Sequence, residues 1–342
     1  MLGTYRLCLA LLVALSHVGV SVAGLNPGVI AVVGFYMASG YVMTAALRSH
    51  YQHTRAVPYF YGDRVLRLFP HYLALACATF AWLALTGAHT EYASDRPGVG
   101  NLVQNLLIVP LNYYMFNHAD RYTLVPPAWS LGAELQFYLV IPMLLLYAGR
   151  KARGFALAAS FAIYLIASFD YINTDWYGYR LLPGVLFMFL IGSWLYDSDQ
   201  HVERGARARL LCIGVVAVAS TLAVLLAHAG KLALLYNRET LLGLAAGIVA
   251  VSALAHRSRR RIDDAIGNLS FGVFLNHFLV LWLLFDGHVE GAAATLTYLG
   301  VSLIVALLLY HAIERPMLNM RRRLRNSRSN TRITLSPSAH GG

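Results

Sequence analysis

An arginine and a histidine share one helix face in the first apolar stretch of the chain. The stretch runs from Tyr5 to Ala23, with Arg6 near its start and His17 eleven residues further on. At about 1.5 Å rise per residue, the imidazole lies about 16 Å beyond the guanidinium along a helix. An ionisable side chain inside a membrane-length segment usually faces a protein interior or a water-filled cavity. His17 is therefore a candidate general base, and a buried structural histidine is the competing interpretation.

A carboxylate occupies a comparable depth in a later apolar segment. Glu134 lies within Trp129–Pro142, about one turn from the start of that segment. A carboxylate beside His17 would fix the tautomer of the imidazole and raise its basicity. Glu134 could instead stabilise the start of its own helix, with Ser130 as the N-cap. The two roles are compatible.

Two arginines at the start of a third apolar segment form another candidate group. Arg64 and Arg67 are three residues apart and share a helix face, from which they could bind phosphate groups bidentately. Together with Arg6 they would suit a polyanionic ligand such as a nucleotide-bearing cofactor. The alternative is that these side chains extend to lipid headgroups, as juxtamembrane arginines commonly do.

Further polar residues occur late in the chain. Asn276 and His277 lie inside one apolar segment, and Glu314-Arg315 closes the last one. His277 could line a cavity or form a hydrogen bond to a neighbouring helix, and Glu314 could pair with Arg315. Position alone makes neither residue catalytic.

The chain shows no pattern of a metal or disulfide site. Its three cysteines, Cys8, Cys77 and Cys212, fall at unrelated spacings within apolar segments. The sequence contains no His-Glu-x-x-His motif, no Cys-x-x-Cys pair and no glycine-rich phosphate loop. We expect no metal in the site.

The elements that must position these residues are membrane-spanning helices. The chain is 58% hydrophobic and 13% charged, whereas soluble domains carry about 25% charged residues. We predict an all-α, polytopic transmembrane helix bundle of ten spans, each near the roughly 20 apolar residues that a bilayer requires. The expected spans are approximately 5–23, 27–47, 66–87, 129–148, 154–169, 180–196, 210–228, 232–254, 269–285 and 293–312. Small residues in Gly34–Thr44 suit close helix packing.

The basic residues orient this bundle. With the N-terminus inside, 22 of the 27 lysines and arginines fall in inner segments. The exceptions, which fall outside or at outer helix ends, are Arg96, Arg121, Arg180, Lys231 and Arg238. This bias places both termini in the cytoplasm. The formal charge of +11 is then a topology signal, and no nucleic-acid partner is needed to explain it.

The domain boundaries follow from the two ends of the chain, and one long outer loop has a further apolar segment. Ser21–Gly24 could pass as a signal-peptide cleavage site, but another span begins at Pro27 after only a tight turn. We therefore expect residues 1–316 to form one transmembrane domain and 317–342 a basic, polar, disordered tail. Within the long outer loop Ala88–Ala128, the semi-apolar piece Asn101–Tyr114 is expected to lie at the interface or to re-enter the membrane.

Taken in order, these residues resemble the acyltransferase-3 family of integral membrane acyltransferases. The family's first span carries an arginine, ten residues and a histidine, and its third begins with Arg-x-x-Arg. A Trp-Ser-Leu-x-x-Glu-x-x-Phe-Tyr segment, a late histidine and a closing Glu-Arg-Pro follow. The matching residues are Arg6, His17, Arg64, Arg67, Trp129, Ser130, Leu131, Glu134, Phe137, Tyr138, His277 and Glu314–Pro316.

The chain departs from the family pattern in three places. Ala133 replaces the first of two acids that the family often has in the Trp-Ser-Leu motif, so only Glu134 can act there. His71 stands where an apolar residue is more usual. We expect no attached extracytoplasmic hydrolase-like domain, so that transfer is completed by the membrane domain or by a separate partner.

The resemblance implies transfer of an acyl group, most often acetyl, from acyl-CoA to a hydroxyl of a glycan or saccharide-linked lipid. It implies a multi-pass protein of the bacterial inner (plasma) membrane. His17 would be the general base or a transient acyl carrier, and Glu134 would orient it or the acceptor. Arg6, Arg64 and Arg67 would bind the CoA phosphates. The residues expected to support substrate or site are Trp129, Ser130, Tyr138 and His277.

A transporter or flippase for a glycan lipid or an acylated intermediate is the competing class. Ten spans, intramembrane His17 and Glu134, and a basic inner mouth would fit it equally. Transporters often carry an internal inverted repeat, and the sequence shows none. The ordered motifs favour the enzyme.

Overall fold

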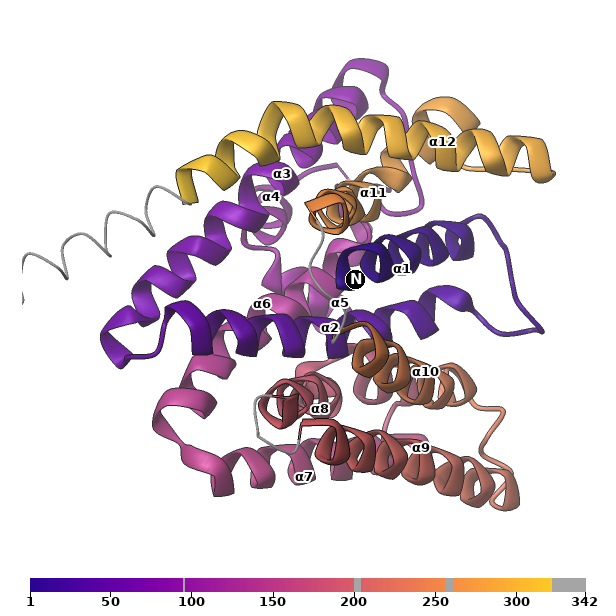
Figure 1. The fold of residues 1–342 in the computed structure, drawn as a ribbon. Coiled ribbons are helices and arrows are strands. Elements are labelled where there is room, and N and C mark those ends of the chain that lie inside the picture. The colour runs from indigo at the N-terminus through magenta and orange to yellow at the C-terminus, as the bar shows by residue number, and fades with distance from the viewer. Residues whose placement is uncertain (95, 200–203, 256–260, 322–342) are drawn as a thin grey trace, which may run out of the picture.

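The protein is a bundle of helices (Figure 1). The computed structural model describes residues 1–94, 96–199, 204–255 and 261–321, and this part of the chain contains no strand. Its α-helices are α1 (Leu2–His17), α2 (Pro27–His50), α3 (Val57–Thr86), α4 (Val99–Leu107), α5 (Tyr114–Asn117), α6 (Ala128–Pro142), α7 (Gly149–Ser168), α8 (Leu182–Asp199), α9 (Arg204–His228), α10 (Asn237–Ala255), α11 (Arg261–Phe285) and α12 (Ala292–Leu309). Short π-helical turns follow α6 (Met143–Tyr147) and α12 (Tyr310–Glu314) and precede α8 (Trp176–Arg180). The all-α prediction is confirmed.

Eight helices in the described part of the chain are long and apolar enough to cross a membrane. They coincide with eight of the ten expected spans, so the chain is an integral, multi-pass membrane protein. The other two expected spans are α1, which has 16 residues, and α7, whose first turns carry Arg150, Lys151 and Arg153. For these two helices the crossing stays a prediction.

α1 and α2 lie at the centre of the bundle. α1 packs against α11 and α2, and α2 packs against α8 and α10. α12 and α3 cover one side, whereas α7 and α9 lie on the other (Figure 1). The helix that carries Arg6 and His17 is thus an integral part of the core.

Glycines bring α2 and α8 into backbone contact. A Cβ added at Gly40 would lie 1.9 Å from the carbonyl oxygen of Phe189, and one at Gly192 would lie 2.0 Å from that of Met37. No side chain fits at either position, so only glycine permits this approach. The close packing predicted for Gly34–Thr44 is confirmed.

A carboxylate on α11 fixes the start of α1. Asp263 accepts hydrogen bonds from the backbone nitrogens of Gly3 and Thr4, at 3.0 and 2.9 Å, and from Thr4 Oγ1 at 2.8 Å. The first backbone N–H groups of a helix have no partner within the helix, and a carboxylate there also complements the helix dipole. This contact sets the depth of Arg6 and His17 relative to α11.

The long outer loop folds back onto the bundle. Tyr113 OH donates to Gln136 Oε1 at 2.6 Å, and Gln136 Nε2 donates to Asn112 Oδ1 at 3.0 Å, which ties the loop to α6. On the other side, Tyr72 OH of α3 donates to the carbonyl oxygen of Asn105 at 2.8 Å. The piece Asn101–Tyr114 therefore packs against α6 and α3.

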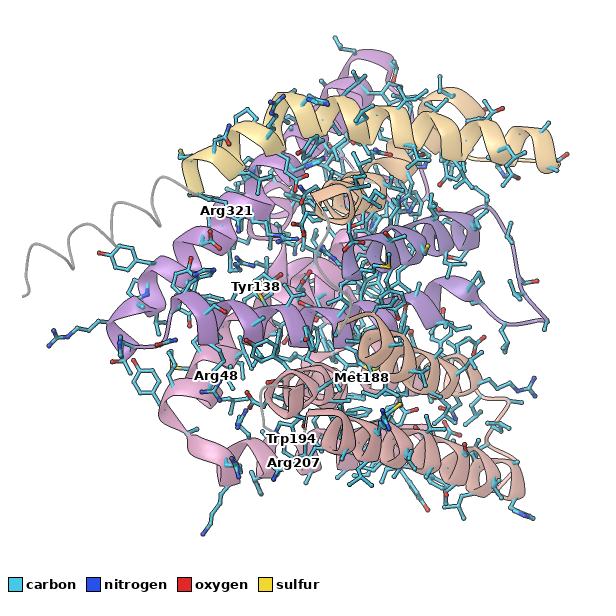
Figure 2. The ribbon with its side chains drawn as sticks, viewed as in Figure 1. Arg48, Tyr138, Met188, Trp194, Arg207 and Arg321 are labelled. Atoms are coloured by element: carbon cyan, nitrogen blue, oxygen red, sulfur yellow. The ribbon has the colours of Figure 1, made fainter. Side chains whose placement is uncertain are left out.

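The last helical segment extends past the expected domain boundary. The helix continues through Arg321, so the expected boundary at residue 316 falls inside it. Arg321 forms a buried ion pair with Asp63 of α3, which holds this extension against the bundle. The rest of the predicted tail lies outside the described residues, as do the inner arginines Arg257, Arg259 and Arg260. Arg48, Arg207 and Arg321 lie toward the same end of the helices (Figure 2), which agrees with the predicted inner side.

Candidate active site

Two adjoining cavities lie inside the bundle. They share the lining residues Val32, Ser130 and Phe274. One, of about 60 Å³, contains Arg6 and is called the inner cavity. The other, of about 440 Å³, contains His17 and is called the outer cavity. The two ends of α1 therefore face different cavities.

His17 lies at the C-terminal end of α1, where the outer cavity reaches its ring. Protein surrounds the imidazole of His17, but the outer cavity extends into the bundle and makes the ring accessible to water. The ring stacks on that of His277, with 5.4 Å between the centroids and 24° between the planes. The ring of Phe278 lies 4.6 Å away. The structure thus gives His17 a water-accessible position and a fixed neighbour.

His277 is fully buried beside His17. Its Nδ1 lies 3.2 Å from the carbonyl oxygen of Val273, one turn earlier on α11. This contact favours the tautomer in which Nδ1 carries the proton. Neighbouring Asn276 donates to the carbonyl oxygen of Ser302, which holds α11 against α12 at this depth.

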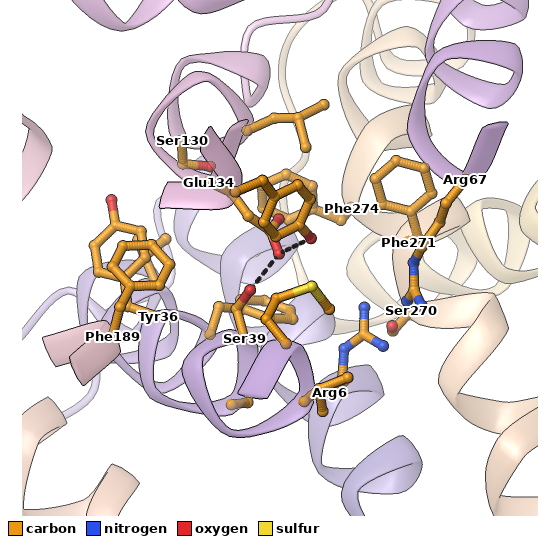
Figure 3. A pocket seen from close by; sticks show the side chains of 17 residues that line it. Arg6, Tyr36, Ser39, Arg67, Ser130, Glu134, Phe189, Ser270, Phe271 and Phe274 are labelled. Atoms are coloured by element: carbon orange, nitrogen blue, oxygen red, sulfur yellow. Dashed lines mark hydrogen bonds between the residues drawn. The ribbon is translucent and has the colours of Figure 1, made fainter. Parts of the chain in front are cut away.

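Glu134 does not contact His17, so the expected carboxylate–histidine pair is wrong. Glu134 Oε1 instead accepts hydrogen bonds from Ser39 Oγ at 2.6 Å and from Tyr138 OH at 2.5 Å in the inner cavity (Figure 3). The reason is the start of α6, which begins at Ala128 rather than at Ser130. Glu134 is therefore nearly two turns into the helix.

The N-cap role of Ser130 is also wrong. Its hydroxyl donates to the carbonyl oxygen of Pro127 at 3.0 Å, within the first turn of α6. Ser130 instead lies at the junction of the two cavities.

Arg6 and Arg67 converge in the inner cavity. Their guanidinium groups lie around Ser270 in Figure 3, and both side chains line the cavity. They come from α1 and α3, which are distant in sequence. Two guanidiniums at one cavity form a natural site for a phosphate-bearing ligand.

Arg64 does not join them. Its side chain is 4% exposed, donates to Asp63 Oδ2 and lies over the ring of Phe60 at 5.5 Å. Arg321 binds the same carboxylate with two hydrogen bonds of 2.7 and 2.9 Å. Arg64 is therefore bound to Asp63 behind Met43 and Tyr138, which line the inner cavity, and is not itself a lining residue. The role predicted for Arg64 at the cofactor phosphates stays a prediction.

Arg180 is a site residue that the sequence reasoning missed. It lines the outer cavity and closes the π-helical turn before α8. Its Nε donates to Asp175 Oδ1 at 2.7 Å, and its guanidinium carbon lies 4.4 Å from the centre of the Trp129 ring. Tyr179 and Tyr114 lie at 5.3 and 5.5 Å. Two features of the sequence could have indicated a functional role for Arg180: it is one of the few basic residues on the outer side, and aromatic residues precede it.

Tyr114 supports the same ion pair from the outer loop. Its hydroxyl donates to Asp175 Oδ2 at 3.3 Å. Burial raises the pKa of Tyr114 to about 12, and the nearby Arg180 cation opposes this shift. The hydroxyl therefore keeps its proton at neutral pH and can donate to Asp175.

No group of three or more potential metal ligands occurs among His, Cys, Asp and Glu in the part of the chain that the structure describes. The site consists of a histidine pair, two convergent arginines, a hydrogen-bonded carboxylate and a caged arginine.

Comparison with known proteins identifies the family. Residues 4–311 match the family model of an acyltransferase domain, acyltransferase-3. The chain belongs to the acyltransferase-3 family. The match has nearly the same extent as the ordered motifs from Arg6 to Pro316, and it favours an acyltransferase over a transporter.

Individual relatives cover different parts of this acyltransferase-3 protein. An uncharacterised protein of Aquifex aeolicus is 37% identical over 210 residues, which are 58% of this chain and 91% of that protein. The O-acetyltransferase OatA of Staphylococcus aureus is 23% identical over 324 residues, which are 86% of this chain and 53% of OatA. The chain thus spans about half the length of OatA. No solved structure matches it.

Proposed function

We propose that this acyltransferase-3 protein transfers an acyl group, most often acetyl, from acyl-CoA to a hydroxyl of a glycan or saccharide-linked lipid. The proposal places the protein in the bacterial inner membrane. One observation carries it: Arg6 and His17, at opposite ends of α1, face two adjoining cavities. The name of the related OatA, an O-acetyltransferase, supports acetyl as the group transferred.

The inner cavity is the proposed entrance for the donor. Arg6 and Arg67 would hold phosphate groups of acyl-CoA, because guanidinium groups bind phosphate with directed, charge-assisted hydrogen bonds. Glu134 would have a different role from the one expected. It fixes Ser39 and Tyr138 and limits the positive charge of the cavity.

The outer cavity is the proposed site of the acceptor. Its volume of about 440 Å³ suits one or two sugar rings, and several aromatic side chains line it. The junction at Val32, Ser130 and Phe274 would be where the acyl group meets the acceptor hydroxyl.

His17 would act at this meeting point. As a general base it takes the proton of the acceptor hydroxyl, whose oxygen attacks the thioester carbonyl carbon. The carbon–sulfur bond then breaks, and the CoA sulfur leaves with the proton that His17 returns. As a nucleophile, His17 would first carry the acyl group itself. The stacked ring of His277 would hold the imidazole in place in either route.

The test is complementation of a strain that lacks this gene. We expect His17→Ala and His17→Gln to abolish acylation of surface glycans, measured by mass spectrometry against the wild-type chain. His228→Gln is the matched control, because His228 is exposed at the end of α9 and lines neither cavity. Normal acylation by membrane-inserted His17 variants at wild-type abundance would overturn the proposal.

A further inference from the structure

Arg180 combines burial, a fixed orientation and access to the cavity that holds His17. Its side chain is 16% exposed, as is that of its partner Asp175. A buried cation is costly unless it is paired and hydrogen-bonded. The structure satisfies this requirement with the Nε–Asp175 bond of 2.7 Å and the Trp129 ring at 4.4 Å.

The cage leaves part of the guanidinium available. A guanidinium has five N–H donors. Asp175 takes the one on Nε. Arg180 and His17 both line the outer cavity. The remaining donors are therefore those that a group bound beside His17 could use.

The charge balance limits what that group can be. Arg180 and Asp175 together are neutral, so this corner has little net attraction for an acceptor that is permanently anionic. Directed donors on a rigid frame are instead effective toward negative charge that develops only during reaction. Acyl transfer creates such a charge on the carbonyl oxygen.

We infer that Arg180 is a catalytic residue that stabilises the negative charge formed on the acyl carbonyl oxygen, and that Trp129 is the residue that positions it. This rests on the proposed function. When the acceptor oxygen bonds to the carbonyl carbon, the C=O electron pair moves to that oxygen, where Arg180 donates hydrogen bonds. His17 holds the hydroxyl proton, and the electron pair returns as the carbon–sulfur bond breaks.

The arrangement also explains the tryptophan that opens the Trp-Ser-Leu motif. Trp129 and Ser130 are adjacent, yet Trp129 lies beneath the guanidinium while Ser130 lies at the junction of the cavities. One motif thereby supports both the charge-stabilising residue and the path of the acyl group.

The experiment uses sealed inside-out membrane vesicles that contain the full-length protein, with radiolabelled acetyl-CoA as the donor and the vesicle's own glycans as the acceptor. We expect Arg180→Gln to lower kcat by about 10²- to 10³-fold, the range seen when one oxyanion donor is removed, with little change in KM for acetyl-CoA. Arg180→Lys should fall between Arg180→Gln and wild type, since a lysine keeps the charge but not the planar donor array. Arg238→Gln, which removes an exposed arginine outside both cavities, should retain wild-type kcat.

A pair of variants at Trp129 keeps the inference testable if Arg180→Gln does not fold. Trp129→Phe retains an aromatic face and should keep most of kcat, whereas Trp129→Leu should lower kcat without raising KM. Wild-type kcat in folded Arg180→Gln, or equal kcat in the two Trp129 variants, would overturn the inference. Activity of His17→Gln in the same vesicles would instead overturn the proposed function, so the two failures are distinguishable.

Discussion

The imidazole rings of His17 and His277 stack with 5.4 Å between their centroids, and the helices that carry them come from opposite ends of the chain. His277 is 0% exposed, while the outer cavity reaches His17. The ring of His277 is thus fixed by packing, and the ring of His17 faces the outer cavity. From this relationship we infer that His277 positions His17, which is one form of the supporting role that the family resemblance implies for it.

We predict that His277→Ala lowers kcat by up to about 10²-fold, the effect of misplacing a reacting group by about 1 Å. His277→Phe should recover much of this loss, because a phenyl ring can also stack on His17. KM for acetyl-CoA should stay near the wild-type value in both variants. Steady-state kinetics in membrane vesicles checks this, and equal losses in Ala and Phe would show that the nitrogen atoms of His277 are needed instead.

A substitution at Glu134 tests its position in the inner cavity, away from His17. Glu134 shares the inner cavity with Arg6 and Arg67, so its charge opposes their attraction for phosphate. Glu134→Gln keeps an oxygen that can accept from Ser39 or Tyr138 and removes the charge. We expect KM for acetyl-CoA to fall by up to about tenfold, equivalent to about 1.4 kcal/mol. A lost kcat with unchanged KM would mean that Glu134 takes part in the chemistry at His17 after all.

The two arginines of the Arg-x-x-Arg motif should behave differently. Arg67→Gln should raise KM for acetyl-CoA, as should Arg6→Gln, because both side chains line the inner cavity. Arg64→Gln should lower the free energy of unfolding by about 3 kcal/mol, since it removes a partner of buried Asp63. Thermal unfolding in detergent and donor kinetics separate the two effects. A normal melting temperature with raised KM for Arg64→Gln would place Arg64 at the cofactor.

The α2–α8 contact can be tested with two glycines. Gly40→Ala should destabilise the protein by about 1–3 kcal/mol, because its Cβ would lie 1.9 Å from the Phe189 carbonyl oxygen. Gly62→Ala is the matched control, since nothing lies within 4 Å of a Cβ at Gly62 on α3. Alanine there should stabilise the helix by up to about 1 kcal/mol. In thermal unfolding we expect a lower melting temperature for Gly40→Ala and a higher one for Gly62→Ala than for the wild-type protein.

Much of the fold was predictable because it depends on local properties of the chain. Hydropathy and length locate spans, and within the described ranges the eight helices that meet both criteria coincide with expected segments. The close approach of α2 and α8 was predictable from small residues such as Gly40. Arg6 and His17 both lie on one helix, α1, as their positions in the first apolar stretch indicated.

The contacts within the site were not predictable, because they depend on residues far apart in sequence. Arg64 and Arg67 share a helix face, but the carboxylate of Asp63 binds Arg64, together with the distant Arg321, in an ion-pair network. The depth of Glu134 depends on where α6 begins. The aromatic cage around Arg180 joins a loop, a helix and a π-helical turn, and no single stretch of sequence contains it.

The central claim is that the donor is bound at the inner cavity and that His17 serves an acceptor at the outer cavity. The most direct measurement supplies radiolabelled acetyl-CoA to the outer face of sealed inside-out vesicles and follows label in glycans inside the lumen. We predict luminal label with the wild-type chain and with His228→Gln, and none with His17→Gln. Luminal label at the wild-type rate in His17→Gln, or label confined to the face that received acetyl-CoA, would contradict the account.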